Sequence, residues 1–88
     1  MRYRMNFYGQ VQGVGFRYTA SHAAERYRLT GWVKNEYDGS VTCEVQGSKE
    51  AIDAWYLFVD QARYISIDRV EKMEIPEDPD ERGFGVRY

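Results

Sequence analysis

The sequence predicts an α+β fold in which two helices cover one face of an antiparallel sheet. Several short segments alternate apolar and polar residues, as half-buried strands do, and two segments carry apolar residues at helical spacing. Hydrophobic residues make up 43% of the 88-residue chain, which is enough to form one core. We therefore expect a single domain over residues 1–88.

The first part of the chain contains a predicted strand, helix and second strand. Residues 2–11 favour a strand, because one face of an extended chain would collect Tyr3, Met5, Phe7, Gly9 and Val11. Helical spacing over residues 18–28 brings together Ala20, Ala23, Ala24 and Tyr27. Gly31 follows as a chain-reversing residue, and residues 31–35 predict a short strand.

A hairpin and a second helix follow. Asp38-Gly39 is typical of a two-residue hairpin turn, and it precedes a predicted strand over residues 40–46. Ser48 is placed to cap a helix over residues 49–62. The amphipathic face of that helix consists of Ile52, Trp55, Val59 and Ala62.

The last quarter of the chain predicts two strands separated by an acidic, solvated loop over residues 76–82. Alternation over residues 66–75 fails between Val70 and Met73, which predicts a β-bulge there. The final strand contains Phe84, Val86 and Tyr88. The element order is β-α-β-β-α-β with one extra strand, the split β-α-β, ferredoxin-like arrangement. We expect the final strand to pair beside the first.

Charge and cysteine content limit the possible partners and compartment. The formal net charge of −2 argues against a general nucleic-acid binder. No apolar run is long enough to cross a membrane. The single cysteine, Cys43, excludes an intramolecular disulfide and suits a reducing compartment. We expect a cytoplasmic monomer.

The stretch Gly9-Gln10-Val11-Gln12-Gly13-Val14-Gly15-Phe16-Arg17 joins the first strand to the first helix. Glycines allow the amide groups of such a turn to converge on an anion, and a helix N-terminus adds unpaired donors. Arg17 would supply a planar fork for two phosphate oxygens. Residues alone leave two readings open, an anion cradle or a simple chain reversal. The stretch matches neither the P-loop nor the dinucleotide fingerprint.

Together with Gly31-Trp32-Val33-Lys34-Asn35, this stretch resembles the acylphosphatase family. The length, the hairpin at Asp38-Gly39 and the helix after Gly47 are similar to that family too. The resemblance covers essentially the whole chain. It implies a hydrolase, without a cofactor or metal, that cleaves an acyl phosphate to a carboxylate and inorganic phosphate.

The resemblance also implies specific site residues. The phosphate would be held by the loop residues Gln12, Gly13, Val14, Gly15, Phe16 and Arg17. Arg17 would be the catalytic arginine, and Asn35 would orient the attacking water. Inorganic phosphate would bind as product or inhibitor. A final strand beside the first could bring the Tyr88 carboxylate near Arg17.

Other residues that could carry chemistry are expected to be structural. His22 lies off the apolar helix face and should be solvated, and Cys43, Trp32 and Trp55 should belong to the core. One histidine makes no metal site. Asp78-x-Asp80 begins like a calcium loop, but Arg82 replaces a ligand there.

Two alternative functions remain. The cradle could bind an anion without turnover, since Ala62-Arg63-Tyr64-Ile65-Ser66 replaces the glycine- and proline-rich connection common in the family. The segment Arg82–Tyr88 resembles an RNA-reading octamer, although that octamer belongs on a third strand, here residues 41–45. The acidic net charge opposes this second alternative.

Overall fold

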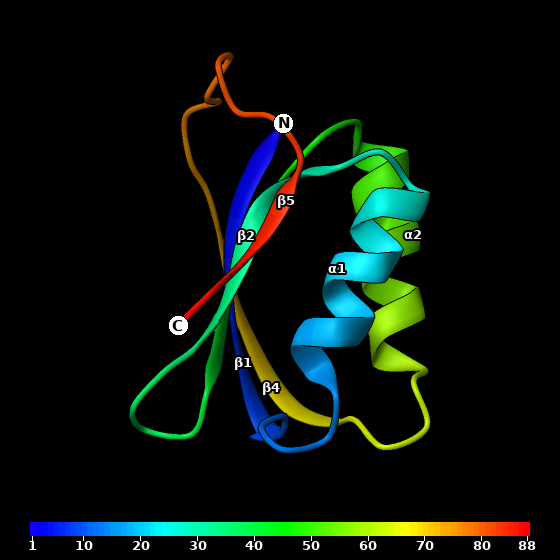
Figure 1. The fold of residues 1–88 in the computed structure, drawn as a ribbon, viewed down its shortest axis with the longest axis vertical. Coiled ribbons are helices and arrows are strands. Elements are labelled where there is room, and N and C mark those ends of the chain that lie inside the picture. The colour runs from blue at the N-terminus through cyan, green and yellow to red at the C-terminus, as the bar shows by residue number, and fades with distance from the viewer.

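Five strands form one sheet in the computed structural model, which describes residues 1–88. Two helices pack on one face of the sheet and leave the other face open (Figure 1). The elements in chain order are β1 (Arg2–Gln10), α1 (Phe16–Arg26), β2 (Thr30–Asn35), β3 (Val41–Gln46), α2 (Lys49–Asp60), β4 (Ser66–Glu74) and β5 (Phe84–Arg87). The predicted ferredoxin-like order is confirmed. No helix is both long and apolar enough to cross a membrane.

The final strand pairs beside β2, so the expectation that it would lie beside the first strand was wrong. The strand order is β4-β1-β3-β2-β5, and β5 runs parallel to β2. Strand β1 already pairs with β3 on one side and with β4 on the other, which leaves it no free edge. The sheet is therefore mixed, with four antiparallel strands and one parallel edge strand.

Several predicted boundaries shift by one or two residues. Helix α1 begins at Phe16 because Gly15 takes the N-cap position, and it ends before Arg28, which has a positive φ of 58°. The β2–β3 hairpin has a longer turn than expected, since Glu36 N–H donates to the Ser40 carbonyl at 2.8 Å. The irregularity in β4 lies opposite Tyr8 and Gly9, not between Val70 and Met73.

The core lies between the sheet and the helices, with Phe7 of β1 at its centre. The Phe7 ring contacts those of Phe16, Trp55 and Tyr56 at centroid distances of 5.0, 6.2 and 6.1 Å. Trp55 is fully buried, and its Nε1–H donates to the Ala20 carbonyl at 2.9 Å, which joins the two helices. These contacts fix the start of α1 against the sheet.

Two further core predictions had different outcomes. Cys43 is fully buried in β3, as expected, and burial raises the pKa of its thiol. Trp32 is 8% exposed but lies on the open face of the sheet, because it alternates with the core residue Val33. Its ring lies between the guanidinium groups of Arg4 and Arg87, 5.9 and 4.4 Å from the ring centroid. Trp32 therefore packs as a buried residue outside the main core.

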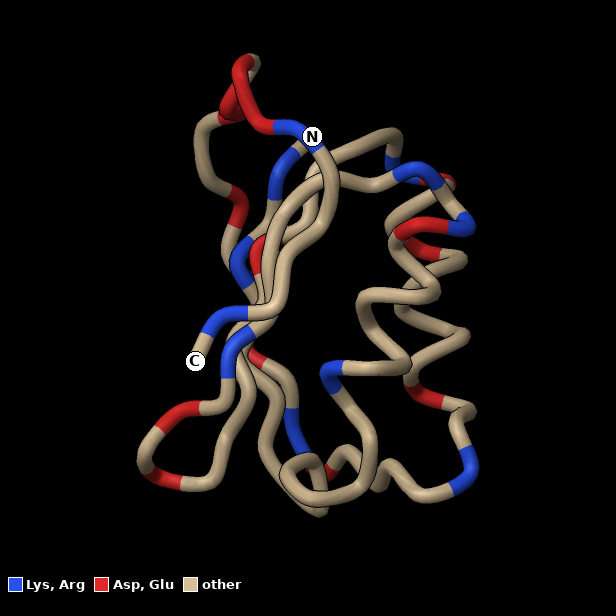
Figure 2. Tube along the Cα trace, viewed as in Figure 1, with Lys and Arg blue, Asp and Glu red and all other residues tan.

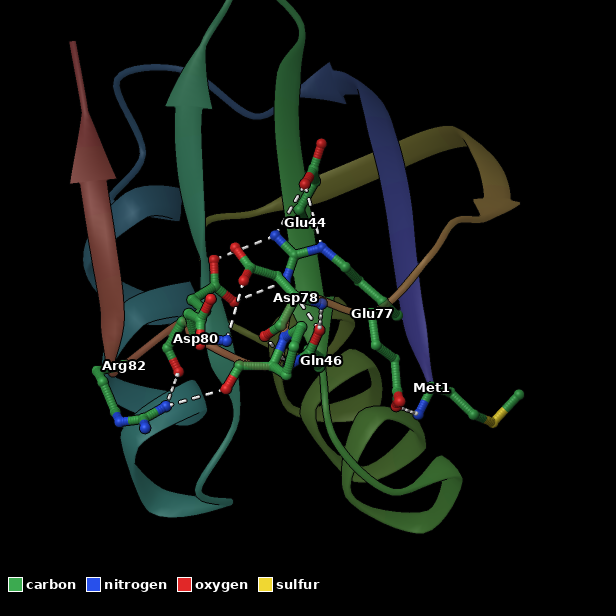
Figure 3. A network of polar contacts seen from close by, with 10 residues as sticks. Met1, Glu44, Gln46, Glu77, Asp78, Asp80 and Arg82 are labelled. Carbon is green, nitrogen blue, oxygen red and sulfur yellow. Dashed lines mark hydrogen bonds and ion pairs between the residues drawn. The ribbon is translucent and has the colours of Figure 1, made fainter.

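Six of the seven residues of the acidic segment over residues 76–82 are exposed, and only Glu81 is partly buried. Arg2 is only 4% exposed, and its guanidinium pairs with Glu44 at 2.8 Å and with Glu81 at 2.6 Å. Gln46 exchanges two hydrogen bonds with the backbone of Asp78, at 2.9 and 2.7 Å. Figure 3 shows Glu44, Gln46 and Asp78 within this network, and Figure 2 shows acidic residues along this segment. The segment is thus an exposed acidic loop, as predicted, but Glu81 and Asp78 tie it to the sheet.

Glu81→Gln should lower the free energy of unfolding by about 1–3 kcal/mol at neutral pH, because Arg2 stays buried with a weaker partner. The Arg2 guanidinium lowers the pKa of Glu81. The ionised pair therefore stabilises the fold above the pKa of an unfolded glutamate, about 4.3. This contribution is lost as the pH falls through the lower pKa of the folded state.

Urea unfolding at neutral pH and at about pH 3 measures the difference between wild type and variant, which should shrink in acid. Glu77→Gln is the control, because its carboxylate is 61% exposed and pairs only with the chain's N-terminal amine. A difference for Glu81→Gln that stays constant with pH would contradict the assignment.

Candidate active site

A cavity of about 360 Å³ lies where the start of α1 meets the ends of β2 and β5. Five of the predicted site residues line it, namely Gly13, Gly15, Phe16, Arg17 and Asn35. Gln12 and Val14, which were predicted with them, do not line it. Arg17 has the only charged side chain among the residues that line the cavity.

The loop before α1 takes left-handed backbone conformations at Gly13 and Gly15, with φ of 74° and 79°. A Cβ atom at either position would meet no atom within 4 Å. Glycine is therefore favoured by the positive φ and not by close packing. This conformation lets the chain enter α1 directly at Phe16, whose side chain is buried in the core.

The N-terminus of α1 has no side-chain cap. The first helical hydrogen bond runs from Thr19 N–H to the Gly15 carbonyl at 2.9 Å, which leaves the amides of residues 16–18 without an acceptor in the helix. Helix α2, in contrast, is capped by Ser48, whose hydroxyl oxygen accepts from Ala51 N–H at 3.1 Å. The uncapped end of α1 offers free donors and a positive partial charge to an anion in the cavity.

Arg17 makes no ion pair with a carboxylate. Its guanidinium lies over the ring of Tyr88, 4.9 Å from the centroid. Tyr88 reaches this position because β5 pairs Arg87 with Lys34, which places the next residue beside Asn35. The predicted proximity of Tyr88 to Arg17 therefore holds, but through the aromatic ring and not through an ion pair of the carboxylate.

Asn35 is the last residue of β2 and lines the same cavity as Arg17. The Gln12 side chain ties the loop before α1 to the hairpin that follows Asn35. Its Nε2 donates to the carbonyls of Glu36 and Ser40 at 2.7 and 2.9 Å. Inside the hairpin, the Asp38 carboxylate accepts from Ser40 N–H and Oγ–H, and these bonds lower the pKa of Asp38. Gln12 thus joins the loop that precedes Arg17 to the hairpin that follows Asn35, and it does so from outside the cavity.

Five residues that line the cavity were not among the predicted site residues: Val11, Tyr18, Ser21, Val86 and Tyr88. Ser21 follows Arg17 by four positions and so shares its helix face, a spacing that is visible in the sequence. Val86 and Tyr88 are two positions apart and so share one face of β5. Only the pairing of β5 with β2 brings that face to the cavity. No three His, Cys, Asp or Glu side chains cluster to hold a metal ion. His22 is exposed, as predicted, and stacks on Tyr18 with ring centroids 4.0 Å apart.

Gln12→Leu should weaken the binding of inorganic phosphate several-fold and lower the free energy of unfolding by about 1–2 kcal/mol, because two hydrogen bonds to the hairpin are lost. Isothermal titration calorimetry and urea unfolding measure the two effects. The matched control is Gln10→Leu, since Gln10 is exposed and makes no side-chain hydrogen bond. Unchanged phosphate affinity in Gln12→Leu would show that the hairpin tie does not shape the cavity.

Tyr88→Leu should weaken phosphate binding by about two- to fivefold, because an exposed cation–π contact of roughly 0.5–1 kcal/mol no longer orients the Arg17 guanidinium. Tyr88→Phe keeps the ring and should bind phosphate like the wild type. The same titration compares the two variants. Equal loss in both would assign the effect to the hydroxyl group instead of the ring.

Comparisons with known proteins agree with this geometry. The acylphosphatase family model matches residues 3–86. An acylphosphatase of Oceanobacillus iheyensis is 40% identical over 87 residues, which covers 97% of this chain and 96% of that protein. The crystal structure of acylphosphatase from Bacillus subtilis matches with a TM-score of 0.91 at 31% identity, over 99% of this chain and 98% of that one.

A solved structure of HypF from T. kodakarensis also matches the whole chain, with a TM-score of 0.86 at 34% identity, but only 12% of that longer protein is covered. The matches to separate acylphosphatases, by contrast, extend over nearly the full length of both partners, in sequence and in structure. This chain therefore belongs to the acylphosphatase family, whose members are hydrolases of acyl phosphates.

Proposed function

We propose that this protein hydrolyses acyl phosphates in the cavity at the start of α1, with Arg17 and Asn35 as its catalytic residues. The observation that carries the proposal is the pairing of an anion cradle with an amide side chain across one cavity. The cradle consists of an uncapped helix N-terminus and an arginine that no carboxylate neutralises. Both features would bind a phosphoryl group and stabilise charge on it.

The loop over residues 12–17 and Arg17 hold the phosphoryl oxygens in this mechanism. Backbone amides of Gly13, Gly15, Phe16 and Arg17 are available at the cavity, whereas Gln12 and Val14 would contribute by setting the loop's path. The guanidinium fork of Arg17 contacts two phosphoryl oxygens at once. These donors stay fixed as charge builds on the transferring group, which is the main source of catalysis in phosphoryl transfer.

Asn35 positions the attacking water. Its side-chain carbonyl oxygen accepts a hydrogen bond from the water and so fixes the position of the water. An amide is too weak a base to remove the proton. The proton passes to a phosphoryl oxygen of the substrate. No general acid is needed on the other side, because the leaving carboxylate has a conjugate-acid pKa of about 4.

The products are a carboxylate and inorganic phosphate, and phosphate would compete with substrate because it fits the same cradle. We also propose that the protein acts as a cytoplasmic monomer. The one cysteine is buried as a free thiol, which suits a reducing compartment. Phosphate binding without turnover is the alternative that the following experiment separates.

Benzoyl phosphate hydrolysis should fall by about 10²–10³-fold in Arg17→Ala and by a comparable factor in Asn35→Ala, as expected for the loss of one fixed transition-state donor. Release of inorganic phosphate measures the rate, and circular dichroism checks that the fold is retained. Arg26→Ala is the control, because Arg26 is an exposed arginine on the same helix that lines no cavity.

Wild-type activity in either site variant would contradict its catalytic role. Binding of phosphate by a wild type that does not hydrolyse benzoyl phosphate would favour the anion-binding alternative. RNA binding is not favoured, since Phe84 of the octamer-like segment faces the helices and packs against the core instead of the open sheet face.

A further inference from the structure

A second cavity of about 550 Å³ continues from the candidate active site along the groove between α1 and β5. The two cavities share Ser21 of α1 and Val86 of β5. The walls of the second cavity include His22, Glu25 and Arg28 on the helix side and Phe84 on the strand side. None of these four residues has a role in the proposed chemistry.

The second cavity extends away from Asn35. Ser21 lies four residues beyond Arg17 on α1, which corresponds to about 6 Å along the helix axis. Val86 pairs with Val33, two residues before Asn35 in β2, so it lies about 7 Å from the level of Asn35. Arg17 and Asn35 therefore lie at the same end of the groove, each about 6–7 Å from the residues that the two cavities share, and the second cavity lies toward the other end.

Phosphoryl transfer requires the attacking and leaving oxygens to lie on opposite sides of the phosphorus atom. A water held by Asn35 attacks from the side of Asn35, so the carboxylate leaves on a side away from Asn35, where the second cavity shares Ser21 and Val86 with the candidate active site. We propose that the second cavity is the binding site for the acyl group of the substrate. This inference depends on the proposed function, because it takes Asn35 as the residue that holds the water.

The walls of this acyl site indicate the class of acyl group. Phe84 and Val86 of β5, with Leu29, form an apolar side, and the charges of Glu25 and Arg28 on the other side offset each other. Such a site favours an uncharged acyl group whose carbon chain or ring lies on β5. An acetyl group is too short to leave the cradle, whereas acyl groups of about four carbons or more reach past Ser21. The structure thus assigns the site to medium-length aliphatic or aromatic acyl phosphates.

The wild type should hydrolyse acetyl, butyryl and hexanoyl phosphate with kcat/KM rising by about twofold for each added methylene, as expected for partial burial in an open groove. Hexanoyl phosphate would then exceed acetyl phosphate by roughly tenfold or more. Phosphate release measures all three under the same conditions. Equal kcat/KM for the three substrates would overturn the acyl site.

Glu25→Trp tests the location, because it fills the far end of the groove from an exposed helix position. The kcat/KM for hexanoyl phosphate should fall by about tenfold, toward the value for acetyl phosphate. Acetyl phosphate hydrolysis and inhibition by inorganic phosphate should not change. His22→Trp narrows the same cavity and should also lower kcat/KM for hexanoyl phosphate. This second variant keeps the test valid if one of the two fails to fold.

Arg26→Trp is the matched control, since it adds the same side chain at the next helix position, outside both cavities. The acyl site would be contradicted if Glu25→Trp lowered kcat/KM for acetyl and hexanoyl phosphate alike. It would also be contradicted if Arg26→Trp lowered kcat/KM for hexanoyl phosphate selectively. These outcomes differ from failure of the proposed function, in which no acyl phosphate is hydrolysed or Arg17→Ala retains full activity.

Discussion

The contact between Phe7 and Phe16 determines where the rest of the site can lie. Phe7 is the centre of the core on β1, and Phe16, with its ring centroid 5.0 Å away, is the first residue of α1. Burial of Phe16 fixes the N-terminus of the helix against the sheet. Neighbouring helix side chains point about 100° apart, so the same burial turns Arg17 out of the core and toward the cavity. The anion cradle therefore depends on core packing and not on the loop alone.

The local patterns in the sequence predicted much of this arrangement. Period-two and period-3.6 patterns gave the order of the elements, because each element must bury one face. Gly13, Gly15 and Arg17 indicated a candidate anion cradle, but the residues alone left a simple chain reversal equally open. Asn35 needed the family resemblance, since an asparagine before a hairpin is also an ordinary turn residue.

The features that sequence reasoning missed are long-range. The partner of β5 depended on which sheet edges remained free after four strands had paired, and no local pattern shows this. Arg2 alternates as an open-face residue, yet Glu81, which pairs with it, lies 79 positions away along the chain. The Gln12 side chain looked like part of the phosphate loop, but its two acceptors belong to a hairpin that forms later in the chain.

The crossing from β4 to β5 has a consequence for the permissible length of the chain. These strands are consecutive in sequence but lie at opposite edges of the sheet, so residues 75–83 span four interstrand spacings (Figure 1). Four spacings amount to about 19 Å, and nine residues reach at most roughly 33 Å when extended. The segment thus has a slack of about 14 Å, which corresponds to roughly four extended residues. Homologues with insertions here can keep the same sheet, whereas a deletion of more than about four residues would force β5 to give up its place beside β2.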